Sequence, residues 1–515
     1  MSRTASISMW NRQPALLLAL AALLFHLPVL ISGGYGIFRD ELYYIACANH
    51  LAFGYVDQPP FSIFVLAIWK GIFGDSLFSI RLLGTLVGVG SVYTGVRIAA
   101  LLGGRWFAQL FTGFALIFAP QLMALRSTFS MNVFDLFLWN LVIRQFLILS
   151  RTGERRMWVQ VGVLLGLTLL NKISGLWLGA GIFIGMLATP LRRDLRTRWP
   201  WLGAGIAILL FMPYVIWQMT HGWATLEFIR NAALYKNAPL GVFGFLKAQF
   251  LNMSPVLTPF WIVGMIVMLL KLEFRPVRAA AFIFPVVLLI LLISGSAKPY
   301  YLAPAFTLPI AAGAIALEWW FSRNRSSRIM QTAVLAVVLI SGVLLAPLAI
   351  PILPVDSFIK YQQKLGVAPA DMERNRVGIL HQFFADMQGW QDLANRVAEM
   401  YIQLPETDRD SVLIFAQNYG EAAAVDYFGE ELGLPPASCG HNNYWLWGPK
   451  PENPSVFLVI GDDIGDLREI FEEVELGTVH TSRYAMPYEA NLPVWVCREP
   501  RVGTAEIWNS VRHYE

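Results

Sequence analysis

Three carboxylates in one short stretch are the clearest candidates for chemistry in this sequence. Asp40 and Glu41 are adjacent and follow the first apolar run of membrane-spanning length, and Asp57 comes shortly after, before a Pro-Pro pair. Charge beside a bilayer is costly, so charged residues found there are functional candidates by default. A carboxylate at this position can act as a general base that takes a proton from an attacking hydroxyl or amine.

Helix capping is the alternative explanation for acidic residues at such positions. Acidic side chains favour helix N-termini, where they accept free amides and complement the helix dipole. One residue would satisfy that need, and this stretch has three, so the functional interpretation is favoured here. For Asp135, which follows Ser130 and Asn132 at the start of another apolar run, capping and function are equally supported.

Basic residues flank the apolar runs on the same predicted side as the carboxylates. Arg126, Lys172 and Lys298 each stand next to a predicted membrane-spanning segment. A lone Lys at such an edge most often extends toward lipid headgroups. Several cations facing the carboxylates can instead bind an anion, and a leaving phosphate would need such partners.

The elements that must position these residues are membrane helices. Of the 515 residues, 56% are apolar and 14% charged, which indicates a polytopic membrane protein. Windows of about 20 apolar residues predict eleven spans, near 15–32, 78–101, 106–122, 134–149, 158–170, 174–189, 201–219, 256–270, 279–294, 302–321 and 331–350. Residues 1–350 hold only ten of the 35 acidic residues. We therefore expect a membrane domain over 1–350 and a water-soluble domain over 351–515.

Charge in the loops predicts the orientation. Basic residues gather in alternate loops, for example at 151–156, 192–198 and 271–278, and such loops face the cytoplasm. The N-terminus is then cytoplasmic, and the C-terminal domain lies on the periplasmic or extracellular side of the plasma (inner) membrane. The outside loops 33–77 and 220–255 are long, and we expect a helix lying on the membrane surface over 41–53 and partial helix in the second loop.

The C-terminal region has the pattern of a small α/β domain. Helical spacing over 388–403 and 464–474 alternates with buried strands over 411–416, 455–460 and 493–497. Segment 440–449 concentrates aromatic and amide side chains, which is typical of a carbohydrate- or lipid-facing loop but also of an interfacial belt. Cys439 and Cys497 could pair outside the cytoplasm. The spacing of the cysteines matches no metal motif.

Several of these segments together resemble the polytopic glycosyltransferases of the protein O-mannosyltransferase type. This is glycosyltransferase family 39 with the GT-C fold, in the bacterial branch of aminoarabinose transferases and Rgt-type galacturonosyltransferases. The likeness covers roughly residues 15–320, and its most specific part is the acidic first loop. It rests on segments 38–41, 55–60, 130–135, 171–172 and 298–304.

The resemblance implies a polyprenyl-phosphate sugar donor and transfer on the outer face of the membrane, without a nucleotide. It implies Asp40 as the catalytic acidic residue with Glu41 beside it. We expect the substrates to contact Asp57, Arg126, Asp135, Lys172, Lys298, Tyr300 and Tyr301. Two departures concern specificity: Gln58 stands where the aminoarabinose-type enzymes have Lys, and Ser130-Met131-Asn132 replaces Thr-Pro-Asp, with the acid later at Asp135.

The sequence thus predicts an integral-membrane glycosyltransferase that inverts the anomeric carbon by single displacement and acts on a lipid, glycan or protein acceptor. The alternative is a polyprenyl-linked lipid transporter or flippase without transferase activity, for which charge pairs within the spans are expected. A divalent metal held by Asp40, Glu41 and Asp57 is compatible with the residue types, although carboxylates alone do not identify one. No nucleic-acid partner is predicted. We expect the C-terminal domain to shape the entrance or select the acceptor and to leave the chemistry to the membrane part; a lid that only stabilises the loops is the alternative.

Overall fold

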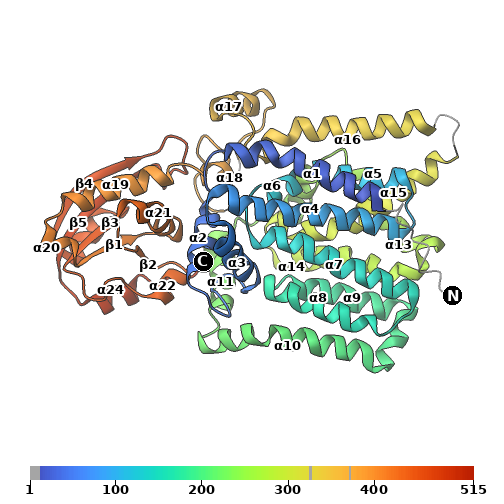
Figure 1. Cartoon of the computed structure of the whole chain (residues 1–515), viewed down its shortest axis with the longest axis horizontal. Helices are drawn as coiled ribbons and strands as arrows, with labels where there is room; N and C mark the ends of the chain where they lie inside the picture. Colours follow the sequence, from blue (N-terminus) through green and yellow to red (C-terminus); the bar gives the residue numbers. More distant parts are fainter. Residues whose placement is uncertain (1–11, 324–326, 370–372) are drawn as a thin grey trace.

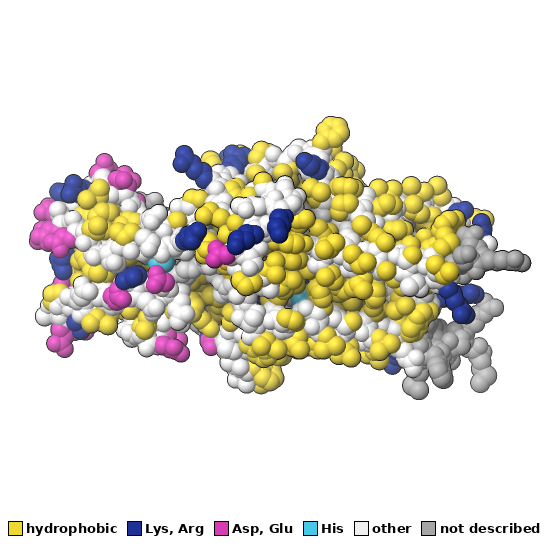
Figure 2. Space-filling view, turned by 90° about the horizontal axis from the view of Figure 1, so that it is seen from above, with side chains coloured by type: hydrophobic (Ala, Val, Ile, Leu, Met, Phe, Trp, Pro, Cys, Tyr) yellow, Lys and Arg dark blue, Asp and Glu magenta, His cyan; other side chains and the backbone are white. Residues whose placement is uncertain are grey.

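The computed structural model describes residues 12–323, 327–369 and 373–515, which form a helical bundle with a sheet domain at one end (Figure 1). The N-terminal end of α1 (Gln13–Ser32) lies at the opposite end of the bundle. On the face seen in Figure 2, apolar side chains cover most of the bundle, whereas acidic side chains gather on the sheet domain. The last bundle helix, α16, ends at Ala349, and we propose the boundary between the two domains directly after it, at 350–351.

Seven helical stretches within the described residues are long and apolar enough to cross a membrane. Five are continuous or nearly so: α1, α4 (Leu77–Leu102), α7 (Met131–Thr152), α10 (Arg198–Thr220) and α16 (Ser327–Ala349). The other two join a 3₁₀ segment to a helix: η4 (Leu272–Phe282) with α14 (Ile283–Ser294), and η5 (Pro299–Phe306) with α15 (Thr307–Phe321). The chain is therefore a multi-pass membrane protein.

Each of the eleven predicted windows falls on an apolar helix, but fewer of these helices have spanning length. Two pairs are bent, α5 (Trp106–Phe118) with α6 (Pro120–Ser127) by 61° and α9 (Gly175–Ala188) with η2 (Pro190–Arg196) by 105°, and counting each pair as one span gives up to nine. Proline at the start of α6 and of η2 ends the preceding helix. The remaining windows are α8 (Met157–Asn171) and α13 (Thr258–Leu270), whose 15 and 13 residues fall short of about 20.

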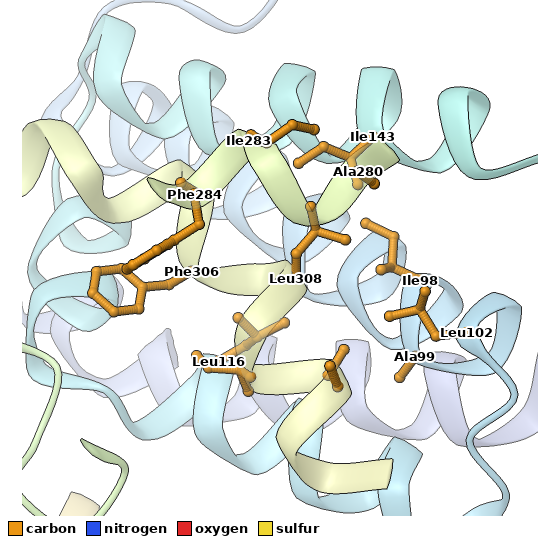
Figure 3. Packing of buried hydrophobic residues seen from close by; sticks show 14 of the residues in the cluster. Ile98, Ala99, Leu102, Leu116, Ile143, Ala280, Ile283, Phe284, Phe306 and Leu308 are labelled. Carbon is orange, nitrogen blue, oxygen red and sulfur yellow. The ribbon is translucent and has the colours of Figure 1, made fainter. Parts of the chain in front are cut away.

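Close helix contacts at glycine hold the bundle together. A side chain at Gly162 of α8 would meet the Gly203 backbone oxygen of α10 at 2.2 Å, and one at Gly264 of α13 would meet the Pro309 oxygen of α15 at 1.8 Å. Such small-residue contacts are typical of membrane helices, where backbones approach closely. Figure 3 shows part of the bundle core, where Leu308 of α15 packs near aliphatic side chains of α4 and α5.

Short helices fill the junction between the bundle and the sheet domain. They are α2 (Arg39–Asn49), α3 (Phe61–Phe73) and α11 (Ala224–Asn231). After α11 come the π-helical turn η3 (Ala232–Lys236) and α12 (Gly241–Asn252), which packs on α14 and η5. The helix predicted over 41–53 is thus present as α2, and the second outside loop is partly helical as predicted. The expectation that α2 lies on the membrane surface is wrong, because α21 (Tyr419–Gly429) packs on it and buries nearly all of its side chains.

The sheet domain has five strands in the order β2-β1-β3-β5-β4. Strands β2 (Ser438–Cys439), β1 (Val412–Ala416) and β3 (Val456–Ile460) are parallel, and β5 (Asn491–Pro500) and β4 (Phe471–Thr481) join them antiparallel. The surrounding helices are α17 (Val355–Lys364), α18 (Gln382–Ala385), α19 (Trp390–Gln403), α20 (Glu406–Arg409), η6 (Glu430–Leu432), α22 (Asn443–Trp447), α23 (Ile464–Ile470) and α24 (Thr504–Ser510).

The α/β prediction for this domain is confirmed, with differences in detail. β1, β3, β5 and α19 lie where strands and a helix were predicted. The helix predicted over 464–474 ends at Ile470, because the chain pairs with β5 from Phe471 onward. Strands β2 and β4 and helices α21 and α24 were not predicted, nor were the short helices α17, α18, α20, η6 and α22.

Cys439 and Cys497, which the sequence left open as a possible pair, do not form a disulfide. Both thiols are free and buried. Cys439 is on β2 and Cys497 on β5, with β1 and β3 between them. Three strand spacings of about 4.8 Å separate the two residues, whereas a disulfide joins Cα atoms about 4.4–6.8 Å apart.

Candidate active site

Asp40 lies in the first turn of α2, where the bundle meets the sheet domain. The hydroxyl of Tyr419, at the start of α21, donates to Asp40 Oδ1 over 2.9 Å. The guanidinium Nε of Arg39 is 3.8 Å from the same oxygen, and 39% of the Asp40 side chain remains exposed. The carboxylate is therefore held in place on one side and open to a substrate on the other.

Glu41 is the adjacent residue, but its carboxylate is fully buried and fully occupied. The Arg81 side chain donates to both oxygens, with Nη2 at 2.8 Å from Oε2. The backbone amides of Phe38 and Phe129 donate over 2.9 Å each. Consecutive residues on a helix point about 100° apart, so Glu41 faces the bundle while Asp40 faces the junction. This geometry favours a structural role for Glu41 over the expected catalytic one.

Asp57 lies across the same junction from Asp40, in the turn before α3. The Tyr43 hydroxyl donates to Asp57 Oδ1 over 3.1 Å. Burial raises the pKa of Asp57 to about 6, and the nearby charge of Asp40 adds to this, while the hydrogen bonds to its own backbone and to Tyr43 act against it. The three carboxylates do not converge, because Glu41 turns away to Arg81. Among the described residues no group of three or more His, Cys, Asp or Glu side chains could hold a metal ion.

Replacing Asp57 by Asn should stabilise the protein above pH 6 while lowering activity. The pKa of Asp57 in the folded protein, about 6, exceeds the ordinary value of 3.8. The folded protein is therefore destabilised by this group as pH rises from about 3.8 through 6, and not at lower pH. The variant should melt a few degrees higher than wild type at pH 8 and at the same temperature near pH 4. Thermal unfolding in detergent at both pH values checks this. Asp410→Asn on the exposed surface is the matched control, and an equal shift at both pH values would contradict the argument.

Three cations meet next to these carboxylates. Lys298 Nζ is 2.8 Å from Glu373 Oε1, and Lys236 Nζ lies over the Tyr419 ring at 5.8 Å from its centre. Burial works to lower the pKa of Lys298, but the charge of Glu373 and more distantly that of Asp40 raise it overall. Lys236 and Arg39 also act on Glu373. The predicted residue Lys298 thus belongs to a cationic cluster with Lys236 and Arg39.

Lys172 extends this cationic region toward the bundle. Its Nζ donates to Asn132 Oδ1 over 2.6 Å and lies 4.5 Å from the Tyr301 ring centre and 5.6 Å from that of Tyr300. Burial lowers the pKa of Lys172 to about 8; the attraction of Asp135 opposes this, and the charge of Lys298 lowers it further. Lys172, Lys298, Tyr300 and Tyr301 are therefore brought together as expected.

Asp135 supports the turn that carries Lys172. Its two carboxylate oxygens accept from the Ser174 hydroxyl, each over 2.9 Å, and the side chain is buried. Ser174 follows Lys172 by two residues in the break between α8 and α9. This arrangement favours a positioning role for Asp135 over direct contact with a substrate.

Arg126 does not join the site, contrary to the expectation. Its guanidinium donates to the backbone oxygens of Leu116 and Ile117, over 2.7 Å each. These carbonyls belong to the last turn of α5, where basic side chains commonly bind free carbonyls. The residue is 2% exposed, so its charge serves the bend between α5 and α6 and is not available to an anion in the junction.

Sequence reasoning missed the contributions of the sheet domain. Tyr419 and Glu373 reach the junction from positions far along the chain, and no local pattern marks either residue. Lys236 stood in a loop whose position was not predictable. Gln58, which the sequence had marked as a departure from the resembling family, is fully buried, and neither of its amide atoms has a hydrogen-bond partner among the described residues.

The aromatic and amide segment 440–449 also reaches the membrane part. Asn443, at the start of α22, accepts from the Val56 backbone amide over 2.7 Å. The backbone amide of Asn443 donates to the Tyr43 hydroxyl over 3.4 Å, and that hydroxyl donates to Asp57. The sheet domain therefore forms one wall of the site, a placement compatible with both expected roles, shaping the entrance or selecting the acceptor.

Sequence and structure comparisons agree with this architecture. Residues 57–217 match the family model of dolichyl-phosphate-mannose-protein mannosyltransferase. No curated protein is similar enough in sequence to count as a match.

Among solved structures, ArnT from Cupriavidus metallidurans is similar over nearly its whole length. In the apo state it shares 14% identity with this chain at a TM-score of 0.60, and the alignment covers 93% of this chain and 97% of ArnT. Its structure bound to undecaprenyl phosphate gives a TM-score of 0.59. The archaeal oligosaccharyltransferase AglB from Archaeoglobus fulgidus, in complex with an inhibitory peptide and a dolichol-phosphate, shares 14% identity at a TM-score of 0.50, covering 84% of this chain and 65% of AglB.

These identities are low, so they establish the shared fold and not the substrates. The chain therefore has the GT-C fold of membrane glycosyltransferases, and its residues 57–217 carry the match to the dolichyl-phosphate-mannose-protein mannosyltransferase family.

Proposed function

We propose that the protein is a membrane glycosyltransferase that moves a sugar from a polyprenyl-phosphate donor to a lipid, glycan or protein acceptor on the outer face of the inner membrane. One observation carries the proposal: Asp40, partly exposed and held by Tyr419, lies beside a row of cations at the membrane end of the sheet domain. The row consists of Lys236, Lys298 and Lys172.

The arrangement suits a single displacement at the anomeric carbon. The acceptor hydroxyl or amine attacks this carbon as Asp40 takes its proton. The bond from the carbon to the phosphate oxygen breaks, and its electron pair leaves with the polyprenyl phosphate. Lys298, Lys236 and Lys172 stabilise the negative charge that develops there, since preorganised cations act strongly in a site shielded from water.

A transfer assay with the purified protein tests the proposal. Radiolabelled polyprenyl-phosphate sugars are supplied with membrane lipid acceptors, and the label should move from the donor to an acceptor fraction. Reconstitution in liposomes adds a second readout. Lipid that crosses the bilayer without any transfer of label would reject the transferase and support a transporter.

A pocket at the C-terminal end of α2, about 13 Å along the helix from Asp40, provides a place for the acceptor. It has a volume of about 370 Å³, within the range of about 300–1,000 Å³ typical of ligand sites. The C-terminal end of α2 lines one side, with Asn49 and with His50 stacked on Trp447 at 4.1 Å between ring centres. Lys450 Nζ faces His50 Nε2 at 3.4 Å. Hydrogen-bond donors and acceptors around an apolar wall suit a sugar ring of the acceptor, and α22 connects this pocket to the Asp57 turn.

Replacing Lys450 by Met should raise the acceptor KM about tenfold with little change in the rate of donor hydrolysis by water. The loss of one charge-assisted hydrogen bond is worth about 1.5–3 kcal/mol, and it affects only acceptor binding. Steady-state transfer measured against acceptor concentration checks this. Lys360→Met on exposed α17 is the control, and an unchanged acceptor KM in the Lys450 variant would remove the pocket from the acceptor path.

A further inference from the structure

A carboxylate from the connection between the bundle and the sheet domain occupies the cationic cluster. Glu373 is 7% exposed, and its Oε1 is 2.8 Å from Lys298 Nζ. The Gln382 side-chain amide donates to its Oε2 over 2.8 Å. Glu373 also forms an isolated antiparallel bridge with Asn237, and the Arg374 amide donates to the Lys236 backbone oxygen over 2.9 Å. The short segment of Glu373 and Arg374 thus contacts both Lys298 and the chain at Lys236.

The charges around Glu373 exceed what a single structural ion pair requires. Burial alone would raise its pKa, but Lys298, Lys236 and Arg39 together hold the pKa of this carboxyl well below its usual range. Arg39 has a second partner in Asp386, at 3.5 Å. For Lys298 the structure shows no other ion pair among the described residues. Arg39 also lies near Asp40, and Lys236 donates to the Glu515 oxygen over 3.2 Å. A buried cation without an anion is strongly unfavourable, so Lys298 in particular needs a negative charge whenever no substrate supplies it.

We propose that Glu373 is an internal anion that occupies the donor-phosphate site when the donor is absent and is displaced from Lys298 by the phosphate of the polyprenyl lipid. This inference rests on the proposed function. A carboxylate and a phosphate bind ammonium groups through the same charge-assisted hydrogen bonds, so the two anions compete for the N–H groups of Lys298 and Lys236. The charge of Asp40 also acts on Lys236 and Lys298. The donor phosphate, once it has displaced Glu373, would therefore bind near the candidate base.

The consequence is an effect opposite to that of an ordinary buried ion pair. Removing the charge of Glu373 removes a competitor of the donor, so the affinity for the donor phosphate rises. The same change leaves Lys298 without its ion pair in the empty protein, while Arg39 keeps Asp386 and Asp40, so thermal stability falls. A purely structural Glu373 would give losses in both measurements, because Lys298 would no longer be held in position.

Binding of undecaprenyl phosphate in detergent to the full-length protein tests this. Glu373→Gln should bind about tenfold more tightly than wild type, a factor that corresponds to about 1.4 kcal/mol. Its melting temperature without lipid should be lower, and the lipid should raise it more than in wild type. Glu452→Gln, an exposed acid in the same domain, is the charge-matched control and should behave as wild type.

Glu373→Asp provides a second variant that keeps the charge, which also serves if Glu373→Gln does not yield folded protein. Its shorter side chain reaches Lys298 less well, so its affinity should rise by a smaller factor. Equal or weaker binding in the Gln variant, or in the Asp variant where only that one folds, would overturn the displacement while leaving the transferase intact. No binding by wild type or variant would overturn both the donor assignment and the displacement.

Discussion

Replacing Asp40 by Asn should lower the rate of sugar transfer by about 10²–10⁴-fold, the contribution usual for a positioned general base. Asn can still accept the hydrogen bond from Tyr419 that holds Asp40, so the shape of the site is preserved while the proton acceptor is lost. The loss should appear in the turnover of bound donor and not in its affinity. Transfer of radiolabelled sugar under single-turnover conditions measures this step directly. Full activity in a folded Asp40→Asn protein would contradict the assignment of Asp40 as the general base.

Tyr419→Phe is the informative companion to this variant. It removes the hydroxyl that donates to Asp40 over 2.9 Å but leaves the carboxylate. We expect a smaller loss than in Asp40→Asn, because the base is present but less well held. An equal loss in both variants would indicate that the Tyr419 hydroxyl itself contacts the reacting groups.

Adjacent residues of α2 show why the sequence alone could not assign the roles of its carboxylates. Asp40 and Glu41 are adjacent carboxylates that follow the same apolar run, so both have the same chemical type and, as judged from the sequence, the same distance from the membrane. Their roles differ because α2 is helical and lies between two partners, with Arg81 of α4 on one side and Tyr419 of α21 on the other. Both partners are distant in sequence, so only the packed structure distinguishes them.

Apolar periodicity performed well where burial in lipid or in a core determines the pattern. Each of the predicted windows lies on a helix, and the strands β1, β3 and β5 were found from their apolar runs. Fewer of the described helices have full spanning length than there are windows, because α8 and α13 are short and the windows over α5 and α9 each contain a sharp bend. The predicted surface helix over 41–53 is instead packed between α21 and α3, which bury most side chains of α2, while Leu51 and Phe53 beyond its end are exposed.

Cationic residues beside the membrane were the harder part of the prediction. Lys172 and Lys298 meet near the carboxylates as expected, whereas Arg126 binds the carbonyls at the end of α5. All three have the same local context in the sequence. The difference arises from the bend between α5 and α6, which leaves carbonyl groups free within reach of Arg126.

Replacing Glu41 by Gln should have the largest effect on stability, about 3–5 kcal/mol, because it leaves the buried charge of Arg81 without its anion. Both side chains are essentially inaccessible, with 1% and 0% exposed, so water cannot compensate. The melting temperature in detergent should fall clearly below that of Asp40→Asn. A variant that melts with wild type would contradict the structural role of Glu41.

Two further measurements separate this role from catalysis. The double variant Glu41→Gln with Arg81→Met should regain part of the lost stability, since replacing both members of a buried pair costs less than breaking it. At a temperature where Glu41→Gln remains folded, transfer per folded molecule should stay within about tenfold of wild type, well above the rate of Asp40→Asn, because an anchoring residue contributes less than the base itself. A loss of transfer equal to that of Asp40→Asn in folded protein would instead support a catalytic role for Glu41. The contacts of Glu41 to Arg81, Phe38 and Phe129 can explain a loss of stability but not the loss of a proton acceptor.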